Sequence, residues 1–377
     1  MRKLITTFLL TINLLILSSC SFYKELIILN WQDYLSFDLI EKFEQENNCI
    51  VTELTTTSNE AMFTDILNRK VPYDVVIPSD YMIDKLQKNN LLNEIDKDKL
   101  NYYYDEDNNP VFVKELYELM TNEKNISYLD YYVPYFWGSL CIMYSKKNFP
   151  EIEEIVQTHG FDVFFEPDLL PKGAKVAMYD SSRDSFAAAE LYLGYSLNTT
   201  DEKELKECAD LLKKSNFKQW KTDELKIDVA SGNTDVALVY SGDFFDAYYA
   251  DIEGDNPQNV ETYGVYAPTK ANNVFYDGMV IPVTSQEVDL AHKFIDFILN
   301  PENNYTNTES VGYCPTTQAI FDEIFADEEG WGDIIAIDAY NPTLIINEAK
   351  EKAEVYKDLG TDGYKALESL YRYIRFN

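Results

Sequence analysis

Residues 26–81 read LIILNWQDYLSFDLIEKFEQENNCIVTELTTTSNEAMFTDILNRKVPYDVVIPSDY. Short apolar runs alternate here with stretches whose apolar side chains recur at helical spacing. The runs that predict strands are Leu26–Trp31, Ile50–Leu54 and Asp74–Pro78, and helices are predicted after Ser36, over Ser58–Lys70 and over Tyr81–Leu91. This βαβαβ order is typical of parallel strands whose connecting helices cover the sheet. The stretch therefore predicts an α/β fold.

A second α/β unit is predicted after the polar segment Tyr102–Asp130 and a crossing segment at Val133–Gly138. Its predicted elements are strands Ala174–Tyr179 and Val236–Tyr240 and helices Ser182–Tyr195, Glu202–Lys214 and Asp223–Ala230. The later predicted elements are the returning segments Tyr263–Ala267 and Val274–Pro282, a helix at Val288–Leu299 and helices from Pro342 onward. Because 377 residues exceed the usual size of one domain, we expect two lobes. The first lobe is predicted to comprise residues 24–135 and 275–318, and the second lobe residues 136–274 and 319–377. Each lobe should be a mainly parallel sheet flanked by helices, and the chain should cross between the lobes.

The N-terminus has the pattern of a signal peptide over residues 1–19. Arg2 and Lys3 precede the nearly apolar run Ile5–Leu17, which is too short to span a bilayer comfortably. Leu17-Ser18-Ser19-Cys20 resembles a bacterial lipobox, which implies cleavage before Cys20, diacylation of its thiol and an extracytoplasmic, membrane-anchored protein. A plain secretory signal with an incidental cysteine is the alternative.

The charge of the chain is strongly acidic, with a formal net charge of −33. Nucleic acid and anionic membrane surfaces are therefore not expected partners, so the lipid anchor is the only predicted membrane contact. An acidic field gathers cations, although general solubility also explains such a charge. The chain has two histidines, far apart in sequence, so no histidine metal site or catalytic triad is expected. Buried free thiols are the favoured reading of Cys49, Cys141, Cys208 and Cys314.

The predicted strand ends carry an unusual combination of side chains. In open α/β sheets, ligands bind outside the carboxyl ends of the strands. Four of these ends, and the predicted crossover, pair an aromatic ring with a hydroxyl or a carboxylate: Asn30–Tyr34, Pro78–Tyr81, Tyr179–Asp184, Tyr240–Asp243 and Phe275–Gly278. Carboxylates replace the water that an ammonium group loses, and ring faces attract ammonium and pack against methylene chains. An anionic ligand would need basic groups, and Arg183 is the only basic residue in these segments.

Each of these residues alone also fits an ordinary structural role. Trp31, Tyr240 and Phe275 could be packing residues, Ser79 could cap a helix, and a single aspartate after a strand often caps a helix or forms a turn. Asp80 is expected to begin the next helix and to matter little for binding. The coincidence of five such segments is what favours a site for a flexible organic cation.

Five segments in the same order and spacing resemble the spermidine/putrescine-binding proteins of polyamine uptake transporters. They are Asn30–Tyr34, Ser58–Met62, Tyr73–Tyr81, Pro134–Gly138 and Gly312–Thr316. The resemblance implies a two-lobed periplasmic-binding-protein-like fold with the ligand clamped between the lobes. It implies binding by Trp31, Gln32, Asp33, Tyr34, Ser79, Tyr81, Ser181, Asp184, Thr222, Tyr240, Asp243, Phe275, Asp277, Tyr313 and Tyr356.

The resemblance also implies roles for these residues. Trp31, Tyr34, Tyr240 and Phe275 match an aromatic box around the methylene chain, and Asp277 matches a carboxylate that holds an amine. Three positions depart from the spermidine type. Ser181 occupies a position where that type has an Asp, and Tyr240 occupies one where a Trp is common. Tyr356 lies near a position that often carries a polar amide side chain. The choice between spermidine and putrescine therefore stays open.

The predicted function is capture of an extracellular polyamine and its delivery to the permease of an ABC transporter. No catalysis, cofactor or metal is expected, and the protein is expected to be a monomer. Closure of the lobes should occur at hinges near Tyr135–Gly138 and Ala267–Phe275. The first alternative is the same fold with a sugar, an amino acid or ferric iron, which 29 tyrosines could help to bind. The second is a surface hydrolase that uses paired carboxylates.

Overall fold

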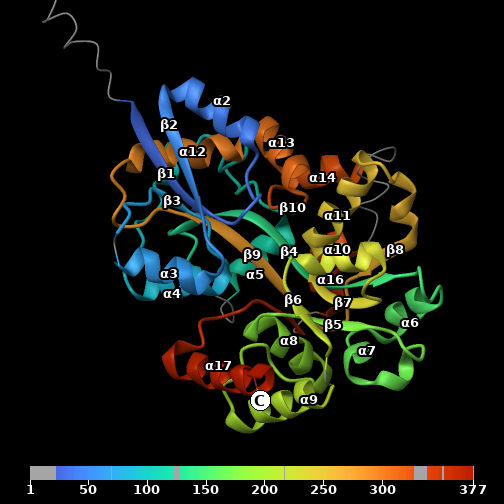
Figure 1. The fold of residues 1–377 in the computed structure, drawn as a ribbon. Helices are drawn as coiled ribbons and strands as arrows, with labels where there is room; N and C mark the ends of the chain where they lie inside the picture. Colours follow the sequence, from blue (N-terminus) through green and yellow to red (C-terminus); the bar gives the residue numbers. More distant parts are fainter. Residues whose placement is uncertain are drawn as a thin grey trace, which may run out of the picture.

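The computed structural model describes residues 23–68, 70–122, 128–215, 217–326, 338–349 and 352–376. Its strands follow one path in the order β2-β1-β3-β9-β4-β7-β5-β6. We call the elements packed around β1, β2 and β3 the first lobe, and those packed around β5, β6 and β7 the second lobe (Figure 1). The predicted α/β class is thus confirmed. The residue limits predicted for the two lobes stay a prediction.

The first lobe begins with the predicted βαβαβ unit. Strand β1 (Lys24–Asn30) pairs in parallel with both β2 (Cys49–Thr55) and β3 (Val75–Val76). The helices that connect them or follow are α2 (Phe37–Asn47), α3 (Asn59–Asn68) and α4 (Asp80–Lys88). Strand β3 is shorter than the predicted Asp74–Pro78, because Pro78 has no backbone N–H to extend the ladder. Ser36 precedes α2 as predicted, but its side chain makes no capping hydrogen bond.

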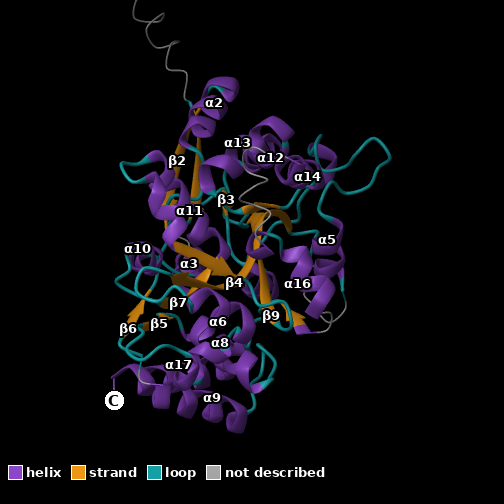
Figure 2. Cartoon of the chain, turned by 90° about the vertical axis from the view of Figure 1, so that its right-hand side faces the viewer, coloured by secondary structure: helices purple, strands orange, loops and turns teal. Residues whose placement is uncertain are grey.

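Two long buried strands connect the lobes. Strand β4 (Tyr132–Ser145) pairs antiparallel with β9 (Asn272–Val280) through its first part and with β7 through its second part. The β4–β9 register shifts between Pro134 and Trp137, where a hinge is predicted. Strand β10 (Cys314–Pro315) pairs with β4 beside this irregularity. Figure 2 shows β4 and β9 running between the helices of the two lobes.

The second lobe is again parallel at its centre. Strand β5 (Val176–Tyr179) pairs in parallel with β6 (Gln219–Lys221) and β7 (Val236–Tyr240), whereas β8 (Tyr263–Tyr266) is antiparallel to β4. Its helices include α6 (Ile152–His159), α7 (Asp162–Phe165), α8 (Ser182–Leu193), α9 (Glu202–Ser215), α10 (Glu224–Ser231) and α11 (Ser241–Glu253). Strand β7 has the predicted limits. Strand β6 was not predicted, because three residues are too short for a periodic pattern.

The remaining helices surround this framework. They are α5 (Lys114–Thr121), α12 (Val288–Leu299), α13 (Pro301–Val311), α14 (Gln318–Ala326), α16 (Pro342–Ala349) and α17 (Gly360–Phe376). The prediction that the tail is helical throughout is wrong at β11 (Ala353–Glu354), which pairs in parallel with Asn272 and Asn273 of β9. The tail therefore touches the strand that connects the lobes before α17 begins.

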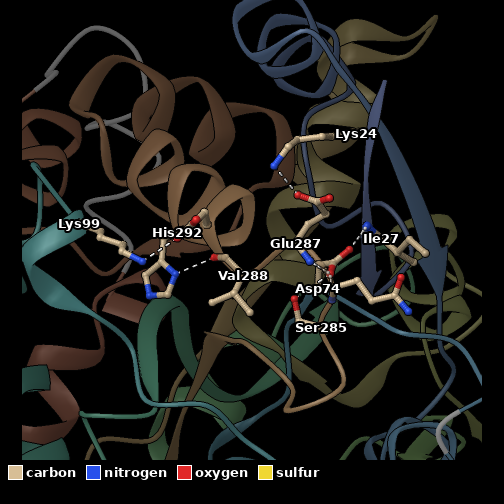
Figure 3. Close-up of polar contacts among 10 residues, drawn as sticks. Lys24, Ile27, Asp74, Lys99, Ser285, Glu287, Val288 and His292 are labelled. Carbon is tan, nitrogen blue, oxygen red and sulfur yellow. Dashed lines mark hydrogen bonds and ion pairs between the residues drawn. The ribbon is translucent and has the colours of Figure 1, made fainter. Parts of the chain in front are cut away.

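Asp74 joins three segments of the first lobe (Figure 3). Its carboxylate accepts hydrogen bonds from the backbone N–H of Ile27 at 3.0 Å, from the Ser285 hydroxyl at 2.7 Å and from the N–H of Glu287 at 3.0 Å. The carboxylate of Asp74, just before β3, thus joins β1 to the segment that leads into α12. The buried His292 lies near the same end of α12, where its Nε2 accepts from the N–H of Asp96 at 2.9 Å, so it serves packing as expected.

The four cysteines after Cys20 are all free and buried, as predicted. Within the described ranges, no helix combines the length and the apolar character that crossing a bilayer requires. Cys20 and the predicted signal peptide lie outside the described residues.

Candidate ligand-binding site

The segment after β1 places Tyr34 against strand β9. Tyr34 is only 6% exposed, and its hydroxyl donates a hydrogen bond to Oδ2 of Asp277 at 2.6 Å. Its ring lies edge-on to Tyr135, Phe136 and Tyr313, with centroids 5.2–5.6 Å apart. Two residues that are 243 positions apart in sequence thus meet.

Asp277 is a buried carboxyl group with one unused oxygen. Residues Ser79 and Asp277 form an isolated antiparallel bridge between the end of β3 and β9. Burial raises the pKa of Asp277 to about 6, although hydrogen bonds from Tyr34 and Ser79 act in the opposite direction. Oδ1 is buried and has no hydrogen-bond partner among the described residues. This oxygen can therefore accept a hydrogen bond from a ligand, and a cationic donor would restore the charged form.

Asp184 occupies the corresponding place in the second lobe. It lies in the first turn of α8, where its N–H donates to the Ser181 hydroxyl at 3.4 Å. Its Oδ1 accepts from the hydroxyls of Tyr240 at 2.6 Å and Tyr356 at 3.0 Å. Ser181 is therefore an N-cap residue that positions Asp184, and the three polar groups form one network.

A continuous row of rings joins the two carboxylates. Tyr34 contacts Tyr313 at 5.2 Å, Tyr313 contacts Phe275 at 6.2 Å, and Phe275 contacts Tyr240 at 5.0 Å between centroids. We call these four residues the aromatic row. Because Tyr34 bonds Asp277 and Tyr240 bonds Asp184, the row has a carboxylate at each end. This arrangement suits an elongated molecule with a cationic group at each end and methylene groups between them.

Glycines allow these rings to approach the backbone closely. A Cβ on Gly242 would lie 2.2 Å from the Tyr313 ring, and a Cβ on Gly138 would lie 2.9 Å from Phe275. Gly242 at the start of α11 and Gly138 in the middle of β4 therefore leave room for the aromatic row because neither has a side chain.

Asp243 has a different environment from the other two carboxylates. Its Oδ2 accepts from the N–H of Tyr240 at 2.8 Å, and its Oδ1 lies 3.8 Å from the Nζ of Lys226. Burial raises its pKa to about 6, whereas the charge of Lys226 lowers it. Asp243 thus caps α11 and already has a cationic neighbour.

Other predicted binding residues lie outside this hydrogen-bonded cluster. Gln32 and Asp33 are exposed and bond each other at 3.4 Å, and Asp33 has a positive φ of 53° in the turn after β1. Thr222 is exposed and donates to Glu224 at 3.5 Å. Trp31 is half-buried against the cores of the first lobe and the crossing strands, and its buried Nε1 has no partner among the described residues.

Two charged residues near the site were not predicted from the sequence. Asp80 begins α4 as expected, yet it is fully buried, and both burial and Asp277 raise its pKa well above the usual value. Arg183 stacks its guanidinium over the rings of Tyr356 at 4.3 Å and Tyr81 at 5.6 Å. Tyr81 in turn donates to Glu60 at 3.1 Å. The sequence around Asp80 predicts only the start of a helix. The burial of Asp80 depends on the packing of both lobes, which a local pattern does not reveal.

A family model described as bacterial extracellular solute-binding protein matches residues 31–305. The putrescine-binding periplasmic protein SpuD of Pseudomonas aeruginosa is 30% identical over 285 residues, which cover 74% of this chain and 74% of that protein. The spermidine/putrescine-binding periplasmic protein of Escherichia coli is 29% identical over 287 residues, which cover 75% of each chain.

The fold resembles solved two-lobed binding proteins. The spermidine/putrescine ABC transporter substrate-binding protein PotD from Streptococcus pneumoniae superimposes with a TM-score of 0.72 at 28% identity. That match covers 93% of this chain and 98% of the other. The predicted periplasmic-binding-protein-like architecture is therefore confirmed.

Proposed function

Because this chain belongs to the bacterial extracellular solute-binding proteins, we propose that it captures putrescine or spermidine outside the cytoplasm and delivers it to an ABC permease. The observation that carries the proposal is the aromatic row with Asp277 at one end and Asp184 at the other. Of the relatives named above, one is a putrescine-binding and the other a spermidine/putrescine-binding periplasmic protein. Capture requires no chemical step, so the protein acts by binding and lobe closure alone.

The physical chemistry of a polyamine matches this site. An ammonium group that leaves water needs a carboxylate partner, which Asp277 supplies with its unused oxygen. The methylene chain packs on ring faces, which also attract the adjacent cationic groups. A sugar would use the rings but would leave the buried carboxylates uncompensated. An amino acid would bring its own carboxylate close to Asp277 or Asp184, where like charges repel.

Thermal unfolding with a panel of ligands tests the proposal. Ligand at about 100 times its Kd stabilises the folded state by roughly 2.7 kcal/mol, so putrescine and spermidine should both raise the Tm. Lysine, arginine, sugars and ferric iron should shift it much less. Spermidine should also change the tryptophan fluorescence through Trp31. Tighter binding of an amino acid than of either polyamine would show that the ligand class is wrong.

Mass spectrometry of small molecules released from the purified protein identifies the natural ligand directly. We expect an intact polyamine. A bound polyamine that is recovered unchanged after long incubation also excludes the alternative of a surface hydrolase. A ligand released as a cleaved product would contradict a pure binding function.

The lipid anchor, the membrane location and the monomeric state are part of this proposal. The support for the anchor is the Leu17-Ser18-Ser19-Cys20 motif after an apolar run. The mature protein should begin at a lipidated Cys20 and partition into detergent, whereas Cys20→Ala should abolish that partition. Membrane-derived protein with an unmodified Cys20 would contradict the anchor. Sedimentation of the detergent-free Cys20→Ala protein should give the mass of one chain.

A further inference from the structure

Helix α17 is fixed to the second lobe along its C-terminal half. The guanidinium of Arg375 donates to both oxygens of Asp180, at 2.8 and 3.1 Å, and lies 4.7 Å from the Trp220 ring. Tyr371 also donates to Asp180, and Leu367 is buried among residues of α8 and α9. Because these contacts stay within one lobe, α17 should move with the second lobe as a rigid body.

The N-terminal half of α17 faces the first lobe instead. In Figure 1, α17 lies below α4. The Nζ of Lys85 on α4 lies 5.5 Å from the centroid of the Tyr364 ring on α17, and 4.5 Å from that of Phe63 on α3. Just before α17, the N–H of Asp358 donates to Oδ2 of the buried Asp84 at 3.4 Å. The ammonium of Lys85 is thus held between one ring from each lobe.

The surroundings of Tyr364 favour a cation at this place. Burial and the nearby carboxylates of Glu60 and Glu368 raise the pKa of Tyr364 above its usual value. Tyr364 therefore stays a neutral phenol whose ring can attract an ammonium group, while the carboxylates compensate the charge of Lys85. Neither Lys85 nor Tyr364 is part of the aromatic row, and neither contacts Asp277 or Asp184 by a hydrogen bond among the described residues.

We propose that Lys85 and Tyr364 form a clasp between the lobes, which stabilises their closed arrangement and slows ligand release. The proposal rests on the proposed binding function, because lobe closure is how such a protein retains its ligand. Opening must separate α4 from α17, since each helix is packed into its own lobe. The clasp acts on closure and not on ligand recognition, so it should affect putrescine and spermidine equally.

Tyr364→Leu and Lys85→Met test the clasp, because each removes the cation–ring attraction but keeps an apolar side chain at the position. A cation–ring contact of this kind predicts Kd values about two- to fivefold higher, which is about 0.5–1 kcal/mol at ~1.4 kcal/mol per tenfold. The increase should come from faster dissociation, measured by stopped-flow tryptophan fluorescence with putrescine and with spermidine. Small-angle X-ray scattering of the unliganded variants should give a larger radius of gyration than the wild type.

The matched control is Tyr373→Leu on the same helix. Its ring lies 3.5 Å from the Nζ of Lys213 on α9, so this Lys–Tyr pair lies wholly within the second lobe. Tyr373→Leu should lower the Tm but leave dissociation rates and scattering unchanged. Equal effects of Tyr364→Leu and Tyr373→Leu, or no effect of Tyr364→Leu on either measurement, would overturn the clasp. If the wild type bound neither polyamine, the proposed function would fail, while scattering of the unliganded proteins would still decide the clasp.

Discussion

At the scale of single residues, Asp277 combines deep burial, a raised pKa of about 6 and one oxygen that has no hydrogen-bond partner in the described part of the chain. Asp277→Asn keeps the shape of the side chain but cannot pair with a buried ammonium group. Loss of one partner of a desolvated charge pair costs about 2–5 kcal/mol, so the Kd for a polyamine should rise about thirtyfold to a few thousandfold. Calorimetric titration measures this, and the Tm of the unliganded variant should not fall, because the neutral amide suits the buried site.

The control for this variant is Asp38→Asn, which removes one charge from an exposed position at the start of α2. Asp80, which the sequence presents as a surface helix start, does not serve as a control because it is fully buried. Similar, small losses in Asp277→Asn and Asp38→Asn would mean that the overall acidic field, and not Asp277, attracts the ligand.

The pH dependence of binding should report on the same carboxyl group. Its pKa is raised from 3.8 to about 6, so the unliganded fold is favoured by protonation and loses up to about 3 kcal/mol as the pH rises from 4 through 6. Binding of an ammonium group needs the ionised form and has the opposite dependence. The affinity for putrescine should therefore fall about tenfold between pH 7.5 and pH 5 in calorimetric titrations.

Tyr34→Phe should shift this profile. The hydroxyl of Tyr34 lowers the pKa of Asp277, so its removal should move the loss of affinity to higher pH. Tyr135→Phe is the matched control, because its buried hydroxyl donates to the carbonyl of Tyr34 at 2.6 Å and not to Asp277. An unchanged profile in Tyr34→Phe, or the same shift in both variants, would contradict the assignment.

The sequence predicted the site where rings and carboxylates follow a strand directly. Tyr240 and Asp184 were singled out this way, because the carboxyl end of a strand is a local feature that also has a fixed place in the sheet. Asp277 was singled out at the predicted crossover instead, and it lies within β9. Asp80 and Arg183 were missed as parts of the site's surroundings. Their burial depends on contacts between lobes, which no local pattern encodes. Gln32 and Asp33 belong to the predicted end of the first strand, whereas Thr222 came from the family resemblance alone. Their side chains are exposed, and a binding role for them stays a prediction.

At the scale of elements, the start of α11 determines where Tyr313 can lie. Gly242→Ala should stabilise the helix by up to about 1 kcal/mol but force the Tyr313 ring to move, since the new Cβ would lie 2.2 Å from it. Overpacking of this kind costs about 1–3 kcal/mol, so the Kd should rise about tenfold or more while the Tm changes little. Calorimetric titration and thermal unfolding together measure both effects.

Gly264→Ala provides the comparison for this variant. Its Cβ would lie 2.6 Å from the hydroxyl of Tyr144, in strand β8 and away from the aromatic row. It should lower the Tm and leave the affinity unchanged. A normal affinity in Gly242→Ala would mean that the position of Tyr313 does not matter for the ligand.

The elements themselves were predicted best where apolar periodicity is long. Strand β7 and helix α12 have the predicted limits, because each presents a full buried face. Helix α11 was missed, since its sequence SGDFFDAYYADIE has a glycine in its first turn and is dense in aromatic residues. Strands β6 and β11 were missed because pairing partners, and not periodicity, define such short strands.

At the scale of the whole molecule, the net charge of −33 should govern how fast a polycation arrives. Electrostatic steering raises association rates and is screened within a Debye length of about 10 Å at 0.1 M salt. The association rate constant for spermidine should fall steeply between about 10 and 500 mM NaCl, with little change in the dissociation rate. Stopped-flow fluorescence separates the two rates. Asp277→Asn should keep the same salt dependence of association, and a salt effect confined to dissociation would contradict steering.

The pairing of β3 and β4 with β9 has a consequence for how the chain is made. Val76 pairs with Val280, and β4 pairs with β9 over most of its first part, so the first lobe is incomplete until β9 exists. At ~5–20 residues per second, roughly 10–40 s of synthesis separate those two valines. During that interval the N-terminal third of the protein has no finished sheet to fold into. The nascent chain therefore stays unfolded during synthesis, and an unfolded chain is the state that a secretion channel accepts.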